Sequence, residues 1–229
     1  MTRRPSASSV AGLLVGVLAA SAMLFTKLAM DVSGGEPIVS FDRATAVWLH
    51  VHATGSVTDV LAAVTQLGAA VVLLPVTLAA ALALLLRRRW AHAALMGAAL
   101  VGGEALNMAL KAAFERPRPS FSHPLATATG FSFPSGHAMV ALTVYGALAF
   151  VVSASVKSRR ARASVVAAAV ALVLAIGFSR VYLGVHYVSD VLAAYSVALA
   201  WLMLCGLTLL VASATAGSAA RRTSSAASS

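Results

Sequence analysis

The stretch VLAAVTQLGAAVVLLPVTLAAALALLL, from Val60 to Leu86, decides the fold class, and Arg87, Arg88 and Arg89 follow it directly. A helix needs about 20 mostly apolar residues to cross the hydrocarbon core of a bilayer. This stretch contains no Asp, Glu, Lys or Arg and exceeds that length, with Pro75 inside it. The sequence therefore predicts one membrane-spanning helix here, long enough to tilt.

Five further stretches of the sequence are also mostly apolar and about long enough to cross a membrane. Of the 229 residues, 60% are apolar and 10% are charged, and the mean hydropathy is +0.89. A soluble domain carries about a quarter charged residues, so a water-soluble enzyme and a disordered chain are both excluded. We expect an all-α, polytopic membrane bundle over residues 10–212, between disordered cytoplasmic tails at 1–9 and 213–229. The six predicted spans are Val10–Met30, Val60–Leu86, Ala91–Leu110, His137–Val156, Ser164–Leu183 and Val191–Ala212.

The basic residues indicate the orientation of this bundle. Of the 17 Lys and Arg residues, those in the two tails and in two of the loops fall on one side of a six-span bundle. The positive-inside rule makes that side the cytoplasm, so we expect a multi-pass plasma membrane protein with both termini cytoplasmic. The basic residues on this side are Arg3, Arg4, Arg87, Arg88, Arg89, Lys157, Arg159, Arg160, Arg162, Arg221 and Arg222.

Two local questions stay open at the level of sequence. Arg3-Arg4 and the small residues Ala20 to Ala22 resemble a cleavable signal peptide, and cleavage would leave five spans with the same orientation. The segment 38–51 has apolar residues at helical spacing, which fits either an amphipathic helix on the outer surface or a loop packed on the bundle. The single cysteine, Cys205, excludes a disulfide framework and a cysteine metal site.

Polar and ionisable residues that are energetically unfavourable near lipid occur mainly in three segments. They are KAAFERPRP at 111–119, PSGH at 134–137, and SRVYLGVHYVSD at 179–190. Ionisable groups near lipid are expensive and indicate function by default. The predicted topology places all three segments at the outer ends of spans, so we expect them to form one active site at the extracytoplasmic face.

The residue types in these segments suit phosphate chemistry. Lys111, Arg118 and Arg180 supply positive charges, and a guanidinium matches phosphate oxygens bidentately. Ser135 and Gly136 precede a predicted helix, whose N-terminal N–H groups can cradle a phosphate.

Three further residues supply the chemistry of group transfer. His186 and Asp190 are four residues apart, so the carboxylate can fix the tautomer of a nucleophilic imidazole. His137 is a candidate general acid. The cations can neutralise a phosphoryl group without a metal or other cofactor, and we expect no nucleic-acid partner.

The motifs Lys-x6-Arg-Pro, Pro-Ser-Gly-His and Ser-Arg-x5-His-x3-Asp together resemble those of the type 2 phosphatidic acid phosphatase superfamily. The resemblance extends over roughly Phe41 to Ala212. It implies a lipid phosphatase in which His186 forms a phosphohistidine and Asp190 orients it, while His137 protonates the leaving oxygen and then activates water. It also implies phosphate binding by Lys111, Arg118, Ser135, Gly136 and Arg180, without metal.

The substrate implied is a membrane lipid phosphate or diphosphate. Candidates are a polyprenyl diphosphate, phosphatidic acid and phosphatidylglycerol phosphate, and an outward site favours recycling of the polyprenyl carrier. The alternatives are a phosphotransferase with the same phosphohistidine, and a lipid transporter or flippase that binds its cargo through the cations. The oligomeric state and the roles of Glu104, Asn107 and His123 stay open.

Overall fold

The computed structural model of the chain describes residues 6–35 and 37–226, with side chains up to Thr215. Every regular element in these residues is helical, which confirms the all-α prediction. The helices are α1 (Ala7–Gly34), α2 (Pro37–Val51), α3 (Gly55–Gln66), α4 (Ala70–Leu86), α5 (Trp90–Phe114), α6 (Gly136–Ser155), α7 (Arg159–Tyr182) and α8 (Val188–Ala226).

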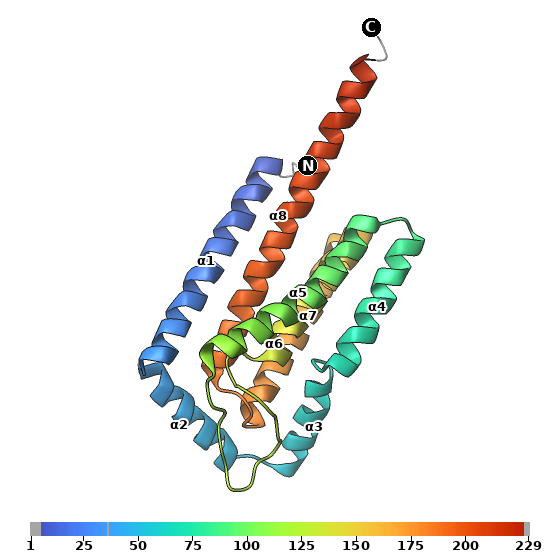
Figure 1. The fold of residues 1–229 in the computed structure, drawn as a ribbon. Coiled ribbons are helices and arrows are strands. Elements are labelled where there is room, and N and C mark those ends of the chain that lie inside the picture. The colour runs from blue at the N-terminus through green and yellow to red at the C-terminus, as the bar shows by residue number, and fades with distance from the viewer. Residues whose placement is uncertain (1–5, 36, 227–229) are drawn as a thin grey trace.

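Within the described residues, six segments are long and apolar enough to cross a membrane, as predicted. Figure 1 shows the described ends of α1 and α8 at the same end of the bundle as the α4–α5 and α6–α7 connections. The long α5–α6 connection lies at the opposite end, beside α2 and α3. The predicted alternation of loops between two ends is therefore present in the fold.

The second span is not the single continuous helix that was expected. It consists of α3 and α4, and the helix is interrupted at Leu67, Gly68 and Ala69. Pro75 lies within α4 without ending it. The interruption falls at Gly68 because the chain there lies against α6 and α7. A Cβ at Gly68 would come within 2.7 Å of Ile176 Cγ2 and 3.4 Å of the His137 carbonyl oxygen.

The open question about segment 38–51 is resolved in favour of a helix, α2. Phe41, Trp48 and Val51 are more than half exposed on it, whereas Asp42 and Ala46 are buried. The helix therefore presents one apolar face outward and packs a second face against the protein. An exposed face of this kind is typical of helices that lie at a membrane surface.

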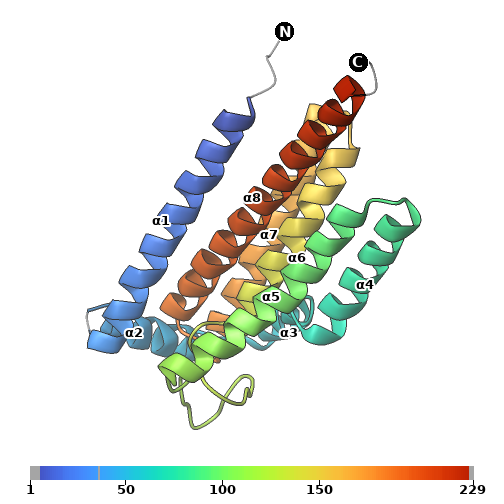
Figure 2. The same cartoon turned by 45° about the horizontal axis from the view of Figure 1, so that its top comes forward.

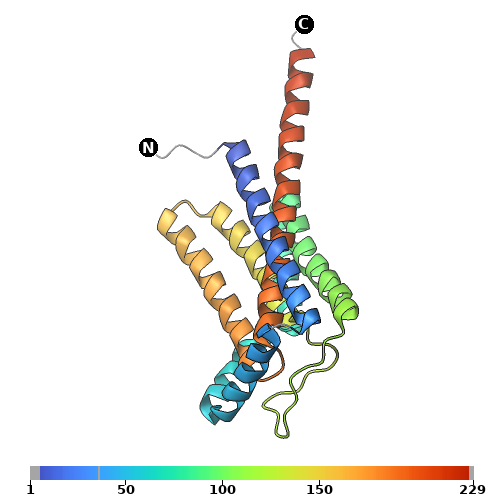
Figure 3. The ribbon, with the colours of Figure 1, turned by 90° about the vertical axis from the view of Figure 1, so that its left-hand side faces the viewer.

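Both ends of the described part of the chain are helical. Helix α1 begins at Ala7, with the Ser6 hydroxyl accepting from the Ser9 N–H, and residues 1–5 lie outside the described part. Helix α8 continues to Ala226 instead of ending near Ala212 (Figure 3). Ala and Arg, which are common in this segment, are strong helix formers.

Helix α6 lies inside the bundle, packed against α5, α7 and α8 (Figure 2). Half of its apolar window is buried, more than in the other spans. Helix α1 packs along α8, and α4 packs along α5. The outer surfaces of these helices expose large apolar side chains, among them Leu13, Met23, Val71 and Val101. Such continuous apolar exposure is satisfied by lipid and not by water.

Candidate active site

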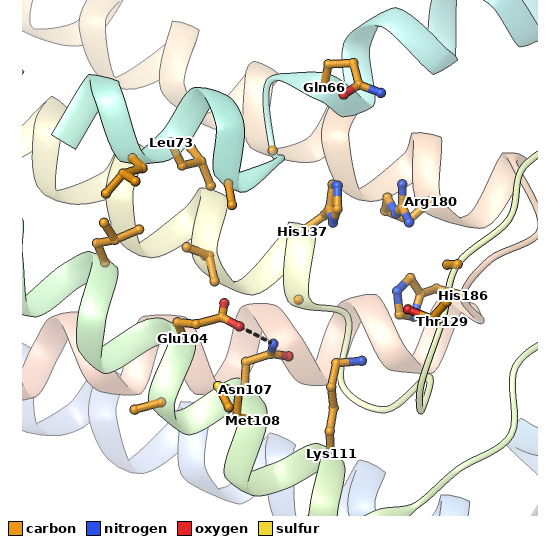
Figure 4. Close-up of a pocket in the computed structure, with 18 of the residues that line it drawn as sticks. Gln66, Leu73, Glu104, Asn107, Met108, Lys111, Thr129, His137, Arg180 and His186 are labelled. Atoms are coloured by element: carbon orange, nitrogen blue, oxygen red, sulfur yellow. Dashed lines mark hydrogen bonds between the residues drawn. The ribbon is translucent and has the colours of Figure 1, made fainter. Parts of the chain in front are cut away.

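The three polar segments meet around one cavity of about 920 Å³. Figure 4 shows side chains from separate helices and from the connecting loops directed into it. The cavity wall includes six of the predicted site residues: Lys111, Arg118, Gly136, His137, Arg180 and His186. Ser135 and Asp190 are fully buried next to this wall. Residues far apart in the sequence are thus brought together at the end of the bundle predicted to hold the site.

The hydrogen bonds of His186 define its tautomer. Its Nδ1 lies 3.4 Å from Asp190 Oδ2, and its Nε2 lies 3.1 Å from Arg118 Nη1. A guanidinium has donors only, so Nε2 must accept this hydrogen bond with its lone pair. The proton then resides on Nδ1, where it faces the carboxylate. In this tautomer Nε2 carries the free lone pair of the ring and directs it toward Arg118.

Burial also favours the neutral form of His186, whose side chain is almost fully enclosed. Desolvation lowers its pKa to about 4, and the positive charges of Arg118 and Arg180 act in the same direction. Asp190 opposes the shift through its hydrogen bond and its charge. The imidazole is therefore neutral near pH 7.

Some polar atoms beside the cavity have no hydrogen-bond partner. The Ser135 hydroxyl and Arg180 Nε are both buried and unpaired. Buried polar groups are normally satisfied, so such atoms indicate a ligand or solvent that would satisfy them. The N–H of Ser135 is already used, because it donates to the Asp190 carbonyl at 3.1 Å. Ser135 can therefore donate to a phosphate from its hydroxyl but not from its N–H, so the phosphate site has one backbone donor fewer than predicted.

Gly136 begins α6, and its first-turn N–H group lacks an intrahelical acceptor. A Cβ at this position would lie 2.9 Å from Asn107 Nδ2. Glycine thus lets the helix start pack closely against Asn107 of α5. This packing brings the positive end of the α6 dipole to the cavity.

The three cations are held by different parts of the structure. Arg118 donates to the carbonyls of Thr129, Gly130 and Val185 at 2.7–2.9 Å. Lys111 donates to the Phe131 carbonyl. Arg180 donates from Nη1 to the Thr65 hydroxyl at 2.8 Å. These contacts orient three positive charges toward one space and stabilise the α5–α6 connection.

Several residues of the site were not predicted from sequence. Arg116 has no role in the predicted site, but it is buried and ion-paired with Asp42 and Asp190. Thr65 belongs to a predicted span, yet its hydroxyl accepts from Arg180 at the site. Glu104 and Asn107, whose roles stay open in the sequence, both line the cavity, and Asn107 Nδ2 lies 3.5 Å from Glu104 Oε1 on the same helix. His123 is exposed and does not line the cavity.

Comparison with known proteins agrees with this arrangement. The profile of the PAP2 superfamily matches residues 92–215. Phosphatidylglycerophosphatase B of Bacillus subtilis is 38% identical over 143 residues, which cover 62% of this chain and 70% of that protein.

Two solved structures share the fold. The crystal structure of the first transmembrane PAP2 type phosphatidylglycerolphosphate phosphatase from Bacillus subtilis matches with a TM-score of 0.77 and 31% identity, covering 82% of this chain and 94% of that one. That of Aquifex aeolicus LpxE matches with a TM-score of 0.54 and 21% identity, covering 73% and 93%. At that identity the second match shows the fold alone.

The profile match includes all three motif segments and the three cations that line the cavity, Lys111, Arg118 and Arg180. It begins at His92, so α2, α3 and α4 lie outside it, although the first structural match covers most of the chain. With a relative of this identity and a shared transmembrane fold, the chain belongs to the PAP2 superfamily and is a membrane-embedded phosphatase.

Proposed function

We propose that this protein hydrolyses the terminal phosphate of a membrane lipid through a phosphohistidine on His186. The observation that carries the proposal is the shape of the cavity. At one end it is lined by His186 and three cations, and it continues between α4 and α5 along Leu73, Leu74, Leu100 and Val101. A cationic head joined to an apolar groove fits a phosphate whose acyl or prenyl chain stays in the bilayer.

The proposed reaction has two steps. First, Nε2 of His186 attacks phosphorus, the P–N bond forms, and the bond between phosphorus and the lipid oxygen breaks. His137 donates a proton to the departing oxygen, and Asp190 accepts a hydrogen bond from Nδ1–H of the phosphohistidine. Second, His137 takes a proton from water, the oxygen of which attacks phosphorus and breaks the P–N bond. Inorganic phosphate then leaves with His186 neutral again.

The phosphate-binding residues act through charge. Lys111, Arg118 and Arg180 face the place where the transferring oxygens would lie, and the Ser135 hydroxyl and the Gly136 N–H add uncharged donors. Such donors stabilise the charge that develops on the phosphoryl group in the transition state of its transfer. No metal is required by this scheme.

The substrate we propose is phosphatidylglycerophosphate, with a polyprenyl diphosphate as the second member of the same class. The identity to a phosphatidylglycerophosphatase supports the first. The extracytoplasmic orientation expected for the site supports the second, because an outward site would suit recycling of a polyprenyl carrier. The loop charges support this orientation.

Phosphate release by the purified protein in detergent with EDTA tests the proposal. The panel contains phosphatidylglycerophosphate, phosphatidic acid and undecaprenyl diphosphate, and the variants are His186→Asn and His52→Asn. His52 is the matched control, because its ring contacts Trp48 within its own segment and does not line the cavity. We expect release by the wild type and His52→Asn, and none by His186→Asn.

Other outcomes would change the assignment. Release lost with EDTA would contradict a site built from cations alone. No release by a folded protein, with phosphate appearing on an added alcohol or lipid, would indicate a phosphotransferase. Lipid transport that persists in His186→Asn would indicate a transporter.

The orientation is tested separately. Cys205 is buried, so Cys205→Ser gives a background for Ser120→Cys in the α5–α6 connection. In intact cells, a membrane-impermeant maleimide should label Cys at position 120. Labelling only after permeabilisation would place the site at the cytoplasmic face.

A further inference from the structure

Arg116 lies behind His186 and occupies one of the unspecified positions of the first motif, Lys-x6-Arg-Pro. It follows the end of α5, and only 8% of its surface is exposed. Its Nη1 donates to Asp190 Oδ1 at 2.6 Å and to the Ser189 hydroxyl at 2.8 Å, while Nη2 donates to Asp42 Oδ2 at 2.9 Å. Its guanidinium carbon is 4.3 Å from the centre of the Tyr187 ring. One arginine therefore joins two buried carboxylates.

Asp42 reaches this position from α2, outside the profile match. It is 1% exposed, and its Oδ1 accepts the Ser189 N–H at 3.0 Å. The Ser189 hydroxyl also donates to Asp42 Oδ2. Asp42 thus holds both Arg116 and the first turn of α8, which carries Asp190.

The two oxygens of Asp190 have separate tasks. Oδ1 faces Arg116, whereas Oδ2 accepts the Tyr187 N–H at 2.8 Å and faces His186 Nδ1. A carboxylate with one oxygen fixed by a guanidinium and the other by a backbone N–H cannot rotate. The direction from which it meets His186 is therefore set by Arg116 together with the Tyr187 N–H.

The charges explain why two carboxylates are needed. Asp190 and Arg116 alone would form a neutral pair and give little stabilisation to a histidine that gains positive character. Asp42 makes the group Asp42–Arg116–Asp190 net negative by one charge. Because all three side chains are buried, water screens this charge weakly.

We propose that Arg116 and Asp42 are positioning residues for the reaction, acting through Asp190 on His186, and that α2 is thereby a required part of the active site. This inference rests on the proposed role of His186 as nucleophile. Neither side chain lines the cavity, so neither touches the substrate.

The test is a double-mutant cycle on phosphate release from phosphatidylglycerophosphate. The variants are Arg116→Lys, Arg116→Gln, Asp42→Asn and Asp190→Asn, with each of the first three also combined with Asp190→Asn. Arg43→Gln is the matched control, because Arg43 is the neighbouring arginine on α2 and is exposed.

We expect Arg116→Gln and Asp42→Asn to lower kcat by about 10²-fold, the effect of a misplacement near 1 Å. KM and the inhibition constant of inorganic phosphate should change little, because the cations in the cavity are intact. Arg116→Lys keeps the charge and should recover about tenfold of the loss. In the Asp190→Asn background these substitutions should cost almost nothing more, since residues that act as a unit are not additive.

A role in folding alone would give a different pattern. It would lower the amount of folded protein and the melting temperature, with kcat per folded molecule near that of Arg43→Gln, and the losses would add to that of Asp190→Asn. Either the additive result or an unchanged kcat would overturn the inference. An active His186→Asn, measured alongside, would instead refute the proposed function itself.

Discussion

The interruption of the second span predicts a specific steric effect of Gly68→Ala. The new Cβ would lie 2.7 Å from Ile176 Cγ2 and 3.5 Å from His137 Cβ. Ordinary carbon contacts are about 3.5–4.0 Å, so the junction of α3 and α4 has to move by about 1 Å. Ile176 is completely buried and cannot yield by turning outward.

The magnitude follows from this overlap. Overpacking of this kind costs about 1–3 kcal/mol of folding free energy. The displaced junction also presses on the start of α6, which carries His137. A shift of about 1 Å there would lower kcat by up to about 10²-fold. The measurements are thermal unfolding in detergent, followed by tryptophan fluorescence, and phosphate release at saturating lipid.

Two companion variants make the reasoning refutable. Gly97→Ala is the control, because a Cβ there has no neighbour within 4 Å and α5 should be unchanged or slightly more stable. Ile176→Ala removes the methyl group that collides, so its combination with Gly68→Ala should be more stable and more active than additivity predicts. If Gly68→Ala matches Gly97→Ala in melting temperature and kcat, the close approach of the junction to α7 is refuted.

Three further expectations concern the phosphate site. Thr65→Val removes the acceptor of Arg180, a bond worth about 1.5 kcal/mol or more, and should weaken inhibition by inorganic phosphate by about tenfold; unchanged inhibition would contradict that role. Ser135→Ala removes a hydroxyl that is unpaired in the free protein, so it should weaken phosphate inhibition by about tenfold with little loss of melting temperature; a large loss of stability would mean that the hydroxyl has a structural partner. Burial lowers the pKa of His186 to about 4, so the neutral imidazole that attacks is present above that pH, and activity falls as the pH drops through it. The pH profile of kcat/KM is first corrected for the second ionisation of the substrate phosphate, near pH 6. An acid limb that remains at about 6.5 would contradict the burial of this residue.

The number of spans and the meeting of the motif segments could be predicted from the sequence. Apolar stretches of sufficient length are separated by runs of arginine, and these features depend on local composition alone. The alternation of the runs assigns the three motif segments to one end, where the structure brings six of the predicted side chains into one cavity. The interruption at Gly68 could not be predicted in this way, because it depends on contacts with α6 and α7 that are distant in sequence.

Asp42 and Arg116 were missed for a related reason. They are 74 residues apart, and each is unremarkable among its neighbours. Two signals were nevertheless present. Arg116 lies in a predicted outer loop, against the general bias of basic residues toward the cytoplasm. Asp42 lies four residues from Ile38 and from Ala46, on the inner face of a helix whose other apolar face is turned outward.

The two faces of α2 suggest why an acidic residue is maintained on the inner one. Phe41, Trp48 and Val51 are exposed and suit the lipid interface, so they fix the depth of the helix but not its attachment to the bundle. Lipid-facing contacts would allow the helix to slide, because the bilayer is uniform along its plane. The ion pair of Asp42 with Arg116 is directional and buried, and removing either partner would leave an uncompensated charge. The ion pairs of Arg116 therefore tie the position of α2 to the geometry of Asp190 and of the proposed nucleophile, His186.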